Sequence, residues 1–230
     1  VIHLAANLVI GEGEKFPKKF YKNNVLGTQS VLFACKGTLV KNFIFSSTAA
    51  VYKDGLYRVS ENSTTKPKSV YGKSKLKAEK IIIEKCNKYQ INYGILRYFN
   101  IVGSSQSGKI GLINKGDHLF KNLSVETLKK SPIFKIYGTN YNTKDGSCIR
   151  DFIHVIDIAE IHVKVIDRIN KLNKSIILNC GYGEGISVKE VINEFKKYAN
   201  KNLKIDILPR RKGDLGKIIA INKKMNKFIN

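Results

Sequence analysis

The stretch Asn42-Phe-Ile-Phe-Ser-Ser47 is a short apolar segment whose first residues show no alternation between polar and apolar side chains. Similar apolar runs occur at residues 1–6 and 93–98, and segments with helical periodicity lie between them, at roughly 17–36 and 71–90. Strands that are apolar on both faces are typical of parallel sheets covered by helices on both sides. The sequence therefore predicts an α/β fold with a Rossmann-like, doubly wound parallel sheet.

From about Gly103 the regular alternation of strands and helices breaks down. Loops rich in Ser and Gly are expected at 103–111 and 138–147, and helical segments resume at 155–170 and 187–199. This half of the chain predicts a smaller, more irregular α/β lobe. Ligands bind at the carboxyl ends of the strands in a doubly wound sheet, so the chemistry is expected just after Phe45 and Phe99.

Composition places the chain among globular proteins. It has 230 residues, of which 43% are hydrophobic and 26% are charged, which excludes disorder, coiled coil and collagen. The formal net charge is +23, but the chain carries 35 Lys against 6 Arg, spread along its length. Phosphate-binding surfaces favour clustered Arg, so we expect a solvated basic surface and no nucleic-acid partner. A basic binding protein stays open as an alternative.

Cysteine and histidine patterns argue against a metal site. The four cysteines show no CxxC spacing, and the histidines form no HExxH arrangement. We expect reduced thiols in a soluble cytoplasmic protein that neither enters a membrane nor binds metal. The chain begins with Val1 inside an apolar segment and ends just after a helical start, so we expect a fragment truncated at both ends.

The sharpest local signal is the pentapeptide Tyr71-Gly-Lys-Ser-Lys75 at the head of a helix. Residues at i and i+4 share one helix face, so the Lys75 ammonium is expected to lower the pKa of Tyr71 and make it a general acid or base. Thr48, at the end of the preceding strand, offers a second hydrogen bond to the same substrate oxygen. The pentapeptide alone is weak, because a chain with 11 Tyr and 35 Lys produces such a match by chance.

The order of the motifs is more specific than any one of them. A strand, Ser46-Ser-Thr48, the Tyr-Lys helix, another strand and Tyr98-Phe-Asn100 follow one another. This set resembles the extended short-chain dehydrogenase/reductase family, and within it the UDP-glucose 4-epimerases. Further segments that carry the resemblance are 3–6, 23–28, 45–52, 97–100, 145–155 and 209–214.

The resemblance implies a resident NAD cofactor and interconversion of UDP-glucose and UDP-galactose through a 4-keto intermediate. Tyr71 would be the base that takes the proton from the sugar 4-hydroxyl, Thr48 its hydrogen-bonding partner, and Lys75 the cation that holds the nicotinamide ribose. Residues 1–102 would be the remainder of the NAD-binding domain. Residues 103–230 would form mainly the nucleotide-sugar lobe, with some segments returning to the NAD-binding domain. A homodimer would form through the helices near 17–36 and 71–90.

Other positions are assigned by the resemblance alone. The expected cofactor contacts are Asn24, Ser47 and Tyr98, besides Tyr71 and Lys75. The expected substrate contacts are Asn100, His118, Leu119, Tyr137, Arg150, Arg211, Asp214 and Ile218, besides Thr48. The family's Gly-rich turn, which binds the NAD pyrophosphate, does not occur in residues 1–230, so this stretch alone should bind NAD poorly.

Several alternatives stay open from the sequence. Thr48 is followed by Ala49-Ala50, where related dehydratases carry an Asp-Glu pair, which favours an epimerase. UDP-N-acetylhexosamine, UDP-glucuronate or a UDP-pentose could replace UDP-glucose as substrate. Arg150 could instead form a surface salt bridge with Asp151. If the chain is complete, a catalytically incompetent member of the family is a further possibility.

Overall fold

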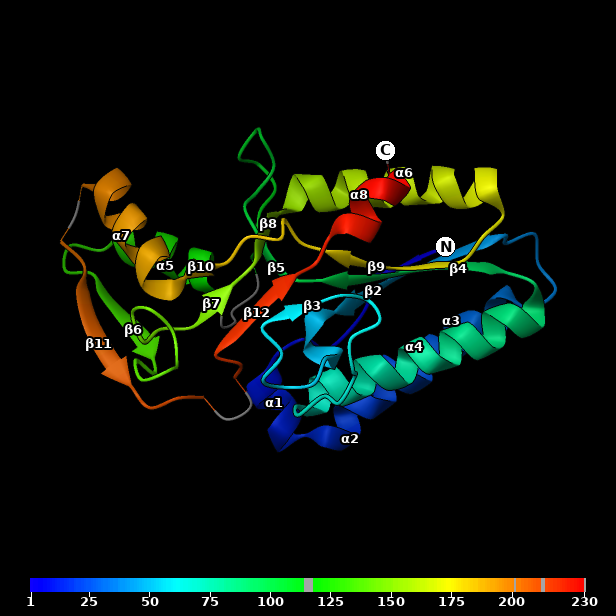
Figure 1. The fold of residues 1–230 in the computed structure, drawn as a ribbon, viewed down its shortest axis with the longest axis horizontal. Helices are drawn as coiled ribbons and strands as arrows, with labels where there is room; N and C mark the ends of the chain where they lie inside the picture. Colours follow the sequence, from blue (N-terminus) through cyan, green and yellow to red (C-terminus); the bar gives the residue numbers. More distant parts are fainter. Residues whose placement is uncertain (114–117, 201, 212–213, 230) are drawn as a thin grey trace.

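The computed structural model describes residues 1–113, 118–200, 202–211 and 214–229. Its main sheet consists of β1 (Ile2–His3), β2 (Asn42–Thr48), β4 (Asn92–Tyr98) and β9 (Ile176–Cys180), all parallel and in the order β1-β2-β4-β9 (Figure 1). The apolar run quoted above is β2, which pairs with β4 along its whole length. The predicted parallel α/β sheet is thus confirmed.

Helices cover both faces of this sheet. Phe43, Phe45 and Ile95 point toward α3 (Gly27–Cys35) and α4 (Val70–Tyr89), where they form one apolar core. Ile44 and Leu96 point the other way, toward α6 (Val155–Leu172) and α8 (Lys223–Ile229). Each strand therefore buries both of its faces, which explains why β2 and β4 have no polar stripe.

The start and end of the long helix α4 follow from local chemistry. The Ser69 side chain accepts a hydrogen bond from the Gly72 amide at 3.1 Å and caps the first turn. The helix ends at Gln90, which adopts a left-handed conformation with φ of 56°. The first turn of α4 is thereby fixed at the carboxyl end of the sheet.

The predicted helix at 17–36 is not continuous. It divides into α2 (Pro17–Phe20), a π-helix (Tyr21–Leu26) and α3, and α1 (Ile10–Lys15) precedes them. The wider π turn shifts Asn24 and Val25 into the protein interior, where both are buried. A π turn inside an α-helix often marks a functional position, and periodicity alone cannot reveal it.

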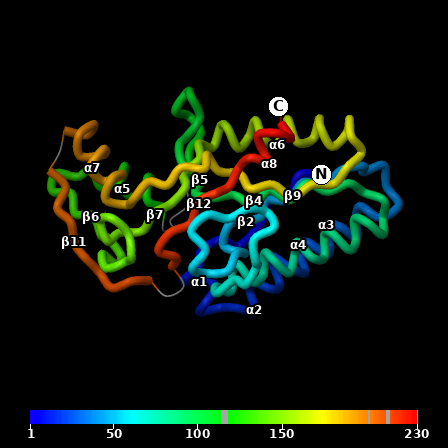
Figure 2. Tube along the Cα trace, in the orientation of Figure 1, coloured from blue at the N-terminus to red at the C-terminus, as the bar shows by residue number. Residues whose placement is uncertain are grey.

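The second half of the chain builds a smaller lobe at one end of the molecule (Figure 2). There β6 (Ile133–Tyr137) pairs with β11 (Lys204–Leu208), and α5 (Leu119–Thr127) and α7 (Val188–Ala199) share a core around Phe134 with them. From the same half, α6, β9 and α8 return to the main sheet.

Short strands connect the two parts. β3 (Arg58–Val59), β12 (Lys217–Ala220), β7 (Ile149–Arg150) and β10 (Ile186–Ser187) form a second sheet, and β5 (Asn100–Val102) pairs with β8 (Phe152–His154). The buried Asp151 joins them, because its carboxylate accepts hydrogen bonds from the amides of Tyr182, Gly183 and Ala220 at 2.9 to 3.0 Å. Across the described residues, no helix is long and apolar enough to cross a bilayer.

Candidate functional site

Thr48, Tyr71 and Lys75 meet where β2 ends and α4 begins. Thr48 is the last residue of β2, and its hydroxyl accepts a hydrogen bond from the Ala50 amide at 3.1 Å, which starts a short 3-10 helix (Ala49–Val51). Tyr71 is the second residue of α4, and its side chain lies close enough to that of Thr48 for the two hydroxyl groups to interact. Lys75 follows one turn later and is buried, with 1% of its surface exposed. The structure therefore brings the three predicted catalytic side chains together.

Gly72 explains how Tyr71 comes so close to Thr48. A Cβ atom at this position would lie 2.4 Å from the Ala50 carbonyl oxygen and 2.9 Å from the Pro67 Cβ. The first turn of α4 therefore packs directly on the backbone that follows Thr48. Only glycine permits this contact, and the glycine sits between the Tyr and the Lys of the motif.

Replacing Gly72 with alanine is expected to destabilise the protein by about 1–3 kcal/mol and to lower activity further by separating Tyr71 from Thr48. Urea unfolding measures the first effect. Gly27→Ala is the matched control, because a Cβ at Gly27 meets no atom within 4 Å and its φ of −57° is helical, so it should be neutral or slightly stabilising. Equal stability of the two variants would contradict the packing argument.

The electrostatics of Tyr71 differ from the sequence expectation. Burial raises the pKa of Tyr71 to about 12, and the hydrogen bond with Thr48 only partly opposes it. The expected lowering by Lys75 does not occur, because burial also lowers the pKa of Lys75 to about 7, against the attraction of Glu79. Desolvation therefore outweighs the charge of the ammonium at Tyr71.

The Lys75 ammonium faces an aromatic ring instead of a hydrogen-bond acceptor. Its Nζ atom lies 4.1 Å from the centre of the Phe45 ring, on which the His3 ring also stacks at 5.7 Å between centroids. Nζ makes no hydrogen bond or ion pair with any part of the chain that the structure describes. A buried ammonium of this kind has donors available for hydroxyl groups of a ligand.

The Ser47 side chain is buried and does not point toward solvent. Its hydroxyl donates to the Glu79 carboxylate, which also forms a buried ion pair with Arg97 of β4 at 2.7 Å. Sequence reasoning missed Glu79 and gave Arg97 no role. The available signal was spacing, since Glu79 follows Tyr71 and Lys75 at successive four-residue intervals on one helix face.

Two expected cofactor contacts, Asn24 and Tyr98, are engaged within the protein. Asn24 is 2% exposed, and its side-chain amide bonds both backbone groups of Asn7 and the Ser74 hydroxyl at 2.8 to 3.1 Å. The Tyr98 hydroxyl lies 2.7 Å from His162 Nε2, whose Nδ1 lies 2.7 Å from the Ile158 carbonyl oxygen. That carbonyl can only accept, so Nδ1 carries the proton and Tyr98 donates to Nε2. The sequence gave no sign of His162.

In the smaller lobe, Arg150 pairs with Asp214 at 2.5 Å. The alternative pair with Asp151 is wrong, because the Asp151 carboxylate is buried and accepts backbone amides instead. The Arg211 guanidinium lies 3.7 Å from the centre of the Tyr137 ring. Arg150, Arg211 and Asp214 therefore bring charges to the expected substrate site, and Arg211 stacks on the Tyr137 ring.

The remaining expected substrate residues are spread around the boundary of the two parts. Asn100 is exposed at the start of β5, and His118 and Leu119 stand at the start of α5. Ile218 is 4% exposed and packs with Ala49 and Phe99. The segments 103–117 and 209–214 are incompletely placed, because 114–117 and 212–213 lie outside the described residues.

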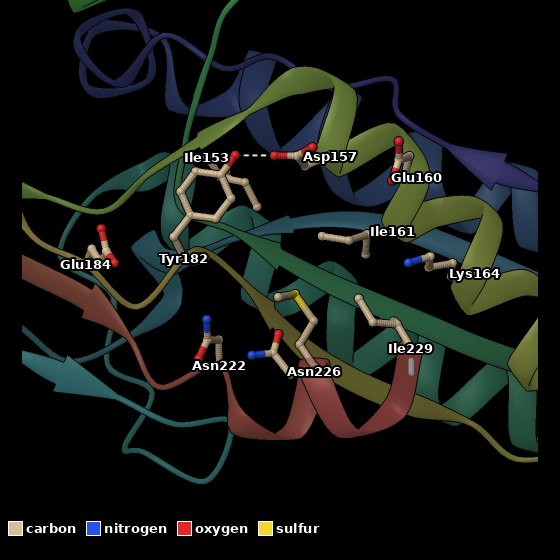
Figure 3. Close-up of a pocket in the computed structure, with 11 residues that line it drawn as sticks. Ile153, Asp157, Glu160, Ile161, Lys164, Tyr182, Glu184, Asn222, Asn226 and Ile229 are labelled. Atoms are coloured by element: carbon tan, nitrogen blue, oxygen red, sulfur yellow. Dashed lines mark hydrogen bonds between the residues drawn. The ribbon is translucent and has the colours of Figure 1, made fainter.

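Two open cavities lie away from the Tyr-Lys pair. The first, of about 530 Å³, lies between α6, α8 and the loop after β9, and its lining includes Asp157, which accepts a hydrogen bond from Tyr182 (Figure 3). The second, of about 360 Å³, is lined by Asn7, Lys19, Lys22, Asn23 and Gly27. The lining of the second includes Asn23 and Gly27 of segment 23–28, and that of the first includes Ile153 of segment 145–155; both segments carry the family resemblance.

The chain is similar to known proteins along almost its whole length. A UDP-glucose 4-epimerase of Halalkalibacterium halodurans is 38% identical over 226 residues, covering 97% of this chain and 68% of the relative. The structure of a UDP-glucose 4-epimerase from Stenotrophomonas maltophila, with bound NAD and formylated UDP-arabinopyranose, is similar with a TM-score of 0.94 at 32% identity, covering 100% of this chain and 69% of that one.

A third protein broadens the range of substrates among the relatives. The UDP-Glc/GlcNAc 4-epimerase of Campylobacter jejuni is 38% identical, with a TM-score of 0.81, and the match covers 99% of this chain and 70% of that one. The chain thus spans about two thirds of the length of these proteins. The profile of the NAD dependent epimerase/dehydratase family matches residues 1–181. The chain belongs to the NAD dependent epimerase/dehydratase family.

Proposed function

We propose that this protein is an NAD-dependent 4-epimerase that interconverts UDP-glucose and UDP-galactose. The observation that carries the proposal is the contact of Tyr71 with Thr48 at the end of β2, with the buried Lys75 one turn away. The names of the relatives supply the substrate class. Ala49 and Ala50, which follow Thr48, have no group that could protonate a leaving hydroxyl, so the site favours epimerisation over dehydration.

The residues around Lys75 fit the ribose end of NAD. The Lys75 ammonium is buried and has no hydrogen-bond acceptor within the described chain, so ribose hydroxyls would satisfy it. Asn24 fits less well, since its amide is already fully engaged. NAD, when bound, supplies the group that accepts and returns the hydride at C4 of the sugar. Ser47 and Tyr98, whose hydroxyl groups bond Glu79 and His162, would then support the site through these neighbours.

Tyr71 is the residue that moves the proton of the sugar 4-hydroxyl. The Thr48 hydroxyl lies beside it and can hold the same substrate oxygen in line. Because the pKa of Tyr71 is about 12 in the structure as it stands, proton removal requires a positive charge close to the phenol. A charged Lys75 supplies this, so the tyrosine works as a base only while the lysine is protonated.

Arg150, Arg211, Asp214 and Tyr137 are suited to a UDP group. The two guanidinium groups can bind a pyrophosphate, and the Asp214 carboxylate can accept hydrogen bonds from ribose hydroxyls. Arg211 covers the Tyr137 ring, so a uracil that stacks on this ring would move Arg211 toward the phosphates. His118, Leu119 and Asn100 complete the proposed substrate contacts from α5 and β5.

UDP-N-acetylhexosamines are the second candidate substrates. The relative from Campylobacter jejuni is named for both sugars, and Ile218, near Ala49 and Phe99, is of intermediate size. Parallel assays with UDP-glucose, UDP-N-acetylglucosamine and a UDP-pentose, each with NAD and analysed by anion-exchange chromatography, separate the candidates. Conversion of UDP-glucose supports the proposal, and conversion of none of the three contradicts it.

We propose that the protein works as a cytoplasmic homodimer in galactose metabolism. The four cysteines are buried free thiols, as is usual in a reducing compartment. Phe33 of α3 is 70% exposed, and Leu26, the last residue of the π-helix before α3, is 55% exposed. These exposed apolar side chains beside α4 are suited to packing against a second copy.

Replacing Phe33 with lysine is expected to convert the dimer into a monomer without unfolding it, because the side chain leaves little core contact behind. Light scattering coupled to gel filtration measures the mass. Tyr198→Lys, at a residue 88% exposed on α7, is the matched control and should remain dimeric. A monomeric unsubstituted protein, or a dimeric Phe33→Lys variant, would contradict the proposed interface.

A further inference from the structure

Glu79 and Arg97 form a buried ion pair near Tyr71 and Lys75. Glu79 is 1% exposed, and both of its oxygens are engaged, Oε1 by Arg97 Nε at 3.0 Å and by the Ser47 hydroxyl, and Oε2 by Arg97 Nη2 at 2.7 Å. Burying an ion pair costs desolvation energy and is weak evidence for stability. Such a pair next to a reactive site therefore invites a functional explanation.

The fixed geometry of Glu79 comes from three elements. α4 supplies the residue, β2 supplies Ser47, next to Thr48, and β4 supplies Arg97. Arg97 Nη1 is in turn 3.0 Å from the Tyr52 hydroxyl, which donates to Asn179 of β9 at 2.5 Å. The carboxylate consequently has little freedom to move, and its charge is held at one place relative to α4.

Lys75 lies one helical turn before Glu79 on the same face of α4, and Tyr71 lies one turn before Lys75. The other groups that face the Lys75 ammonium are the Phe45 ring from β2 and His3 from β1. Among the described residues, no carboxylate lies within 4.0 Å of Lys75, so Glu79 acts on it through its charge and not by a direct salt bridge.

We propose that Glu79 is a positioning residue, whose carboxylate, fixed by Arg97 and Ser47, is the counter-charge that keeps the Lys75 ammonium ionised beside Tyr71. This inference rests on the proposed function of the site. It gives the buried ion pair a role in the charge state of the lysine, whereas a structural role would concern only the packing of α4 against β4.

The balance of charges around Lys75 supports this role. Burial lowers the pKa of Lys75 to about 7, and Glu79 is the group that opposes the fall. Burial and the charge of Lys75 lower the pKa of His3, so His3 is neutral at pH 7 and adds no second positive charge beside Lys75. Without Glu79 the lysine would be mainly neutral at pH 7, and a neutral amine cannot stabilise the Tyr71 phenolate.

Glu79→Gln and Arg97→Gln test the proposal as a pair, because both break the same ion pair but change the charge near Lys75 in opposite directions. The titration midpoint of Lys75 is read by NMR of protein labelled with [13Cε]lysine, and its signal is the one that disappears in Lys75→Arg. We expect Glu79→Gln to lower the midpoint by about one pH unit or more. Arg97→Gln should leave the midpoint unchanged or raise it.

A third variant guards against loss of folding. Glu79→Gln combined with Arg97→Met removes both charges of the ion pair, so neither is left unpaired and the variant should fold even if the single variants do not. It also lacks the counter-charge and should show the lowered midpoint. Glu84→Gln is the matched control, because its side chain is 66% exposed on α4 and its loss should not move the Lys75 signal.

The two possible failures are distinguishable. A midpoint that stays unchanged without Glu79, or that falls equally in Arg97→Gln, would overturn the counter-charge role whatever the activity. If the unsubstituted protein converts no UDP-sugar while the midpoint shifts as expected, the proposed function fails and the charge coupling stands. In an active enzyme, the pH above which kcat declines should move down with the Lys75 midpoint in Glu79→Gln, and a purely structural loss would lower kcat evenly at every pH.

Discussion

Replacing Tyr71 with phenylalanine is expected to lower kcat for UDP-hexose epimerisation by roughly 10³-fold, the usual size of a lost general base. The phenol is the group in this site that can exchange a proton with the sugar 4-hydroxyl, and the phenylalanine ring keeps the packing of the first turn of α4. KM should change little, because most of the proposed UDP contacts lie in the smaller lobe. Steady-state assays with UDP-galactose measure both constants.

Tyr198→Phe provides the control for the loss of a hydroxyl as such. Tyr198 is 88% exposed at the end of α7, far along the chain from the proposed site, so this variant should retain full activity. If Tyr71→Phe retains more than about a tenth of the activity, Tyr71 is not the base. Circular dichroism should show the same fold for both variants.

Replacing Lys75 with methionine is expected to abolish activity and at the same time to stabilise the protein at pH 7. The pKa of Lys75 is about 7 in the folded chain and 10.5 as an unperturbed group. Between these values the unfolded chain binds the proton that the folded chain has lost, so the buried lysine costs stability. The cost is largest below about pH 7 and disappears as the pH rises through 10.5.

The expected gain for Lys75→Met at pH 7 is about 2–4 kcal/mol in the free energy of unfolding, measured in urea without NAD. At pH 10.5 the gain should shrink toward zero. Lys80→Met, on the exposed side of α4, is the control and should be within about 0.5 kcal/mol of the unsubstituted protein at both pH values. If Lys75→Met were less stable than the unsubstituted protein at pH 7, burial of the lysine would not cost stability, and the account would be wrong.

The sequence was sufficient to predict the main sheet and the meeting of the three side chains proposed to be catalytic. Strands such as β2 are apolar on both faces because helices cover both sides, and that pattern predicts a parallel sheet. Thr48 ends a strand and Tyr71 begins the next long helix. In such a fold these two positions share one edge of the sheet, so their contact follows from topology.

The sequence was insufficient where a role depends on burial or on a partner far along the chain. The pair of Glu79 with Arg97 and the bond from Tyr98 to His162 join residues 18 and 64 positions apart. The partner of Arg150 also lies 64 positions away, whereas the neighbouring Asp151 turns to backbone amides. The pKa of Tyr71 rises because the phenol is desolvated, which helix spacing cannot reveal.

The central claim is that this site interconverts UDP-glucose and UDP-galactose by means of Tyr71. The most direct test follows the reaction from both sides, starting one sample from each sugar nucleotide with NAD and analysing both by anion-exchange chromatography. We predict that the two samples reach the same mixture, and that Tyr71→Phe leaves each starting material essentially unchanged over the same time. Two unchanged samples of the unsubstituted protein, or equal conversion by Tyr71→Phe, would contradict the account.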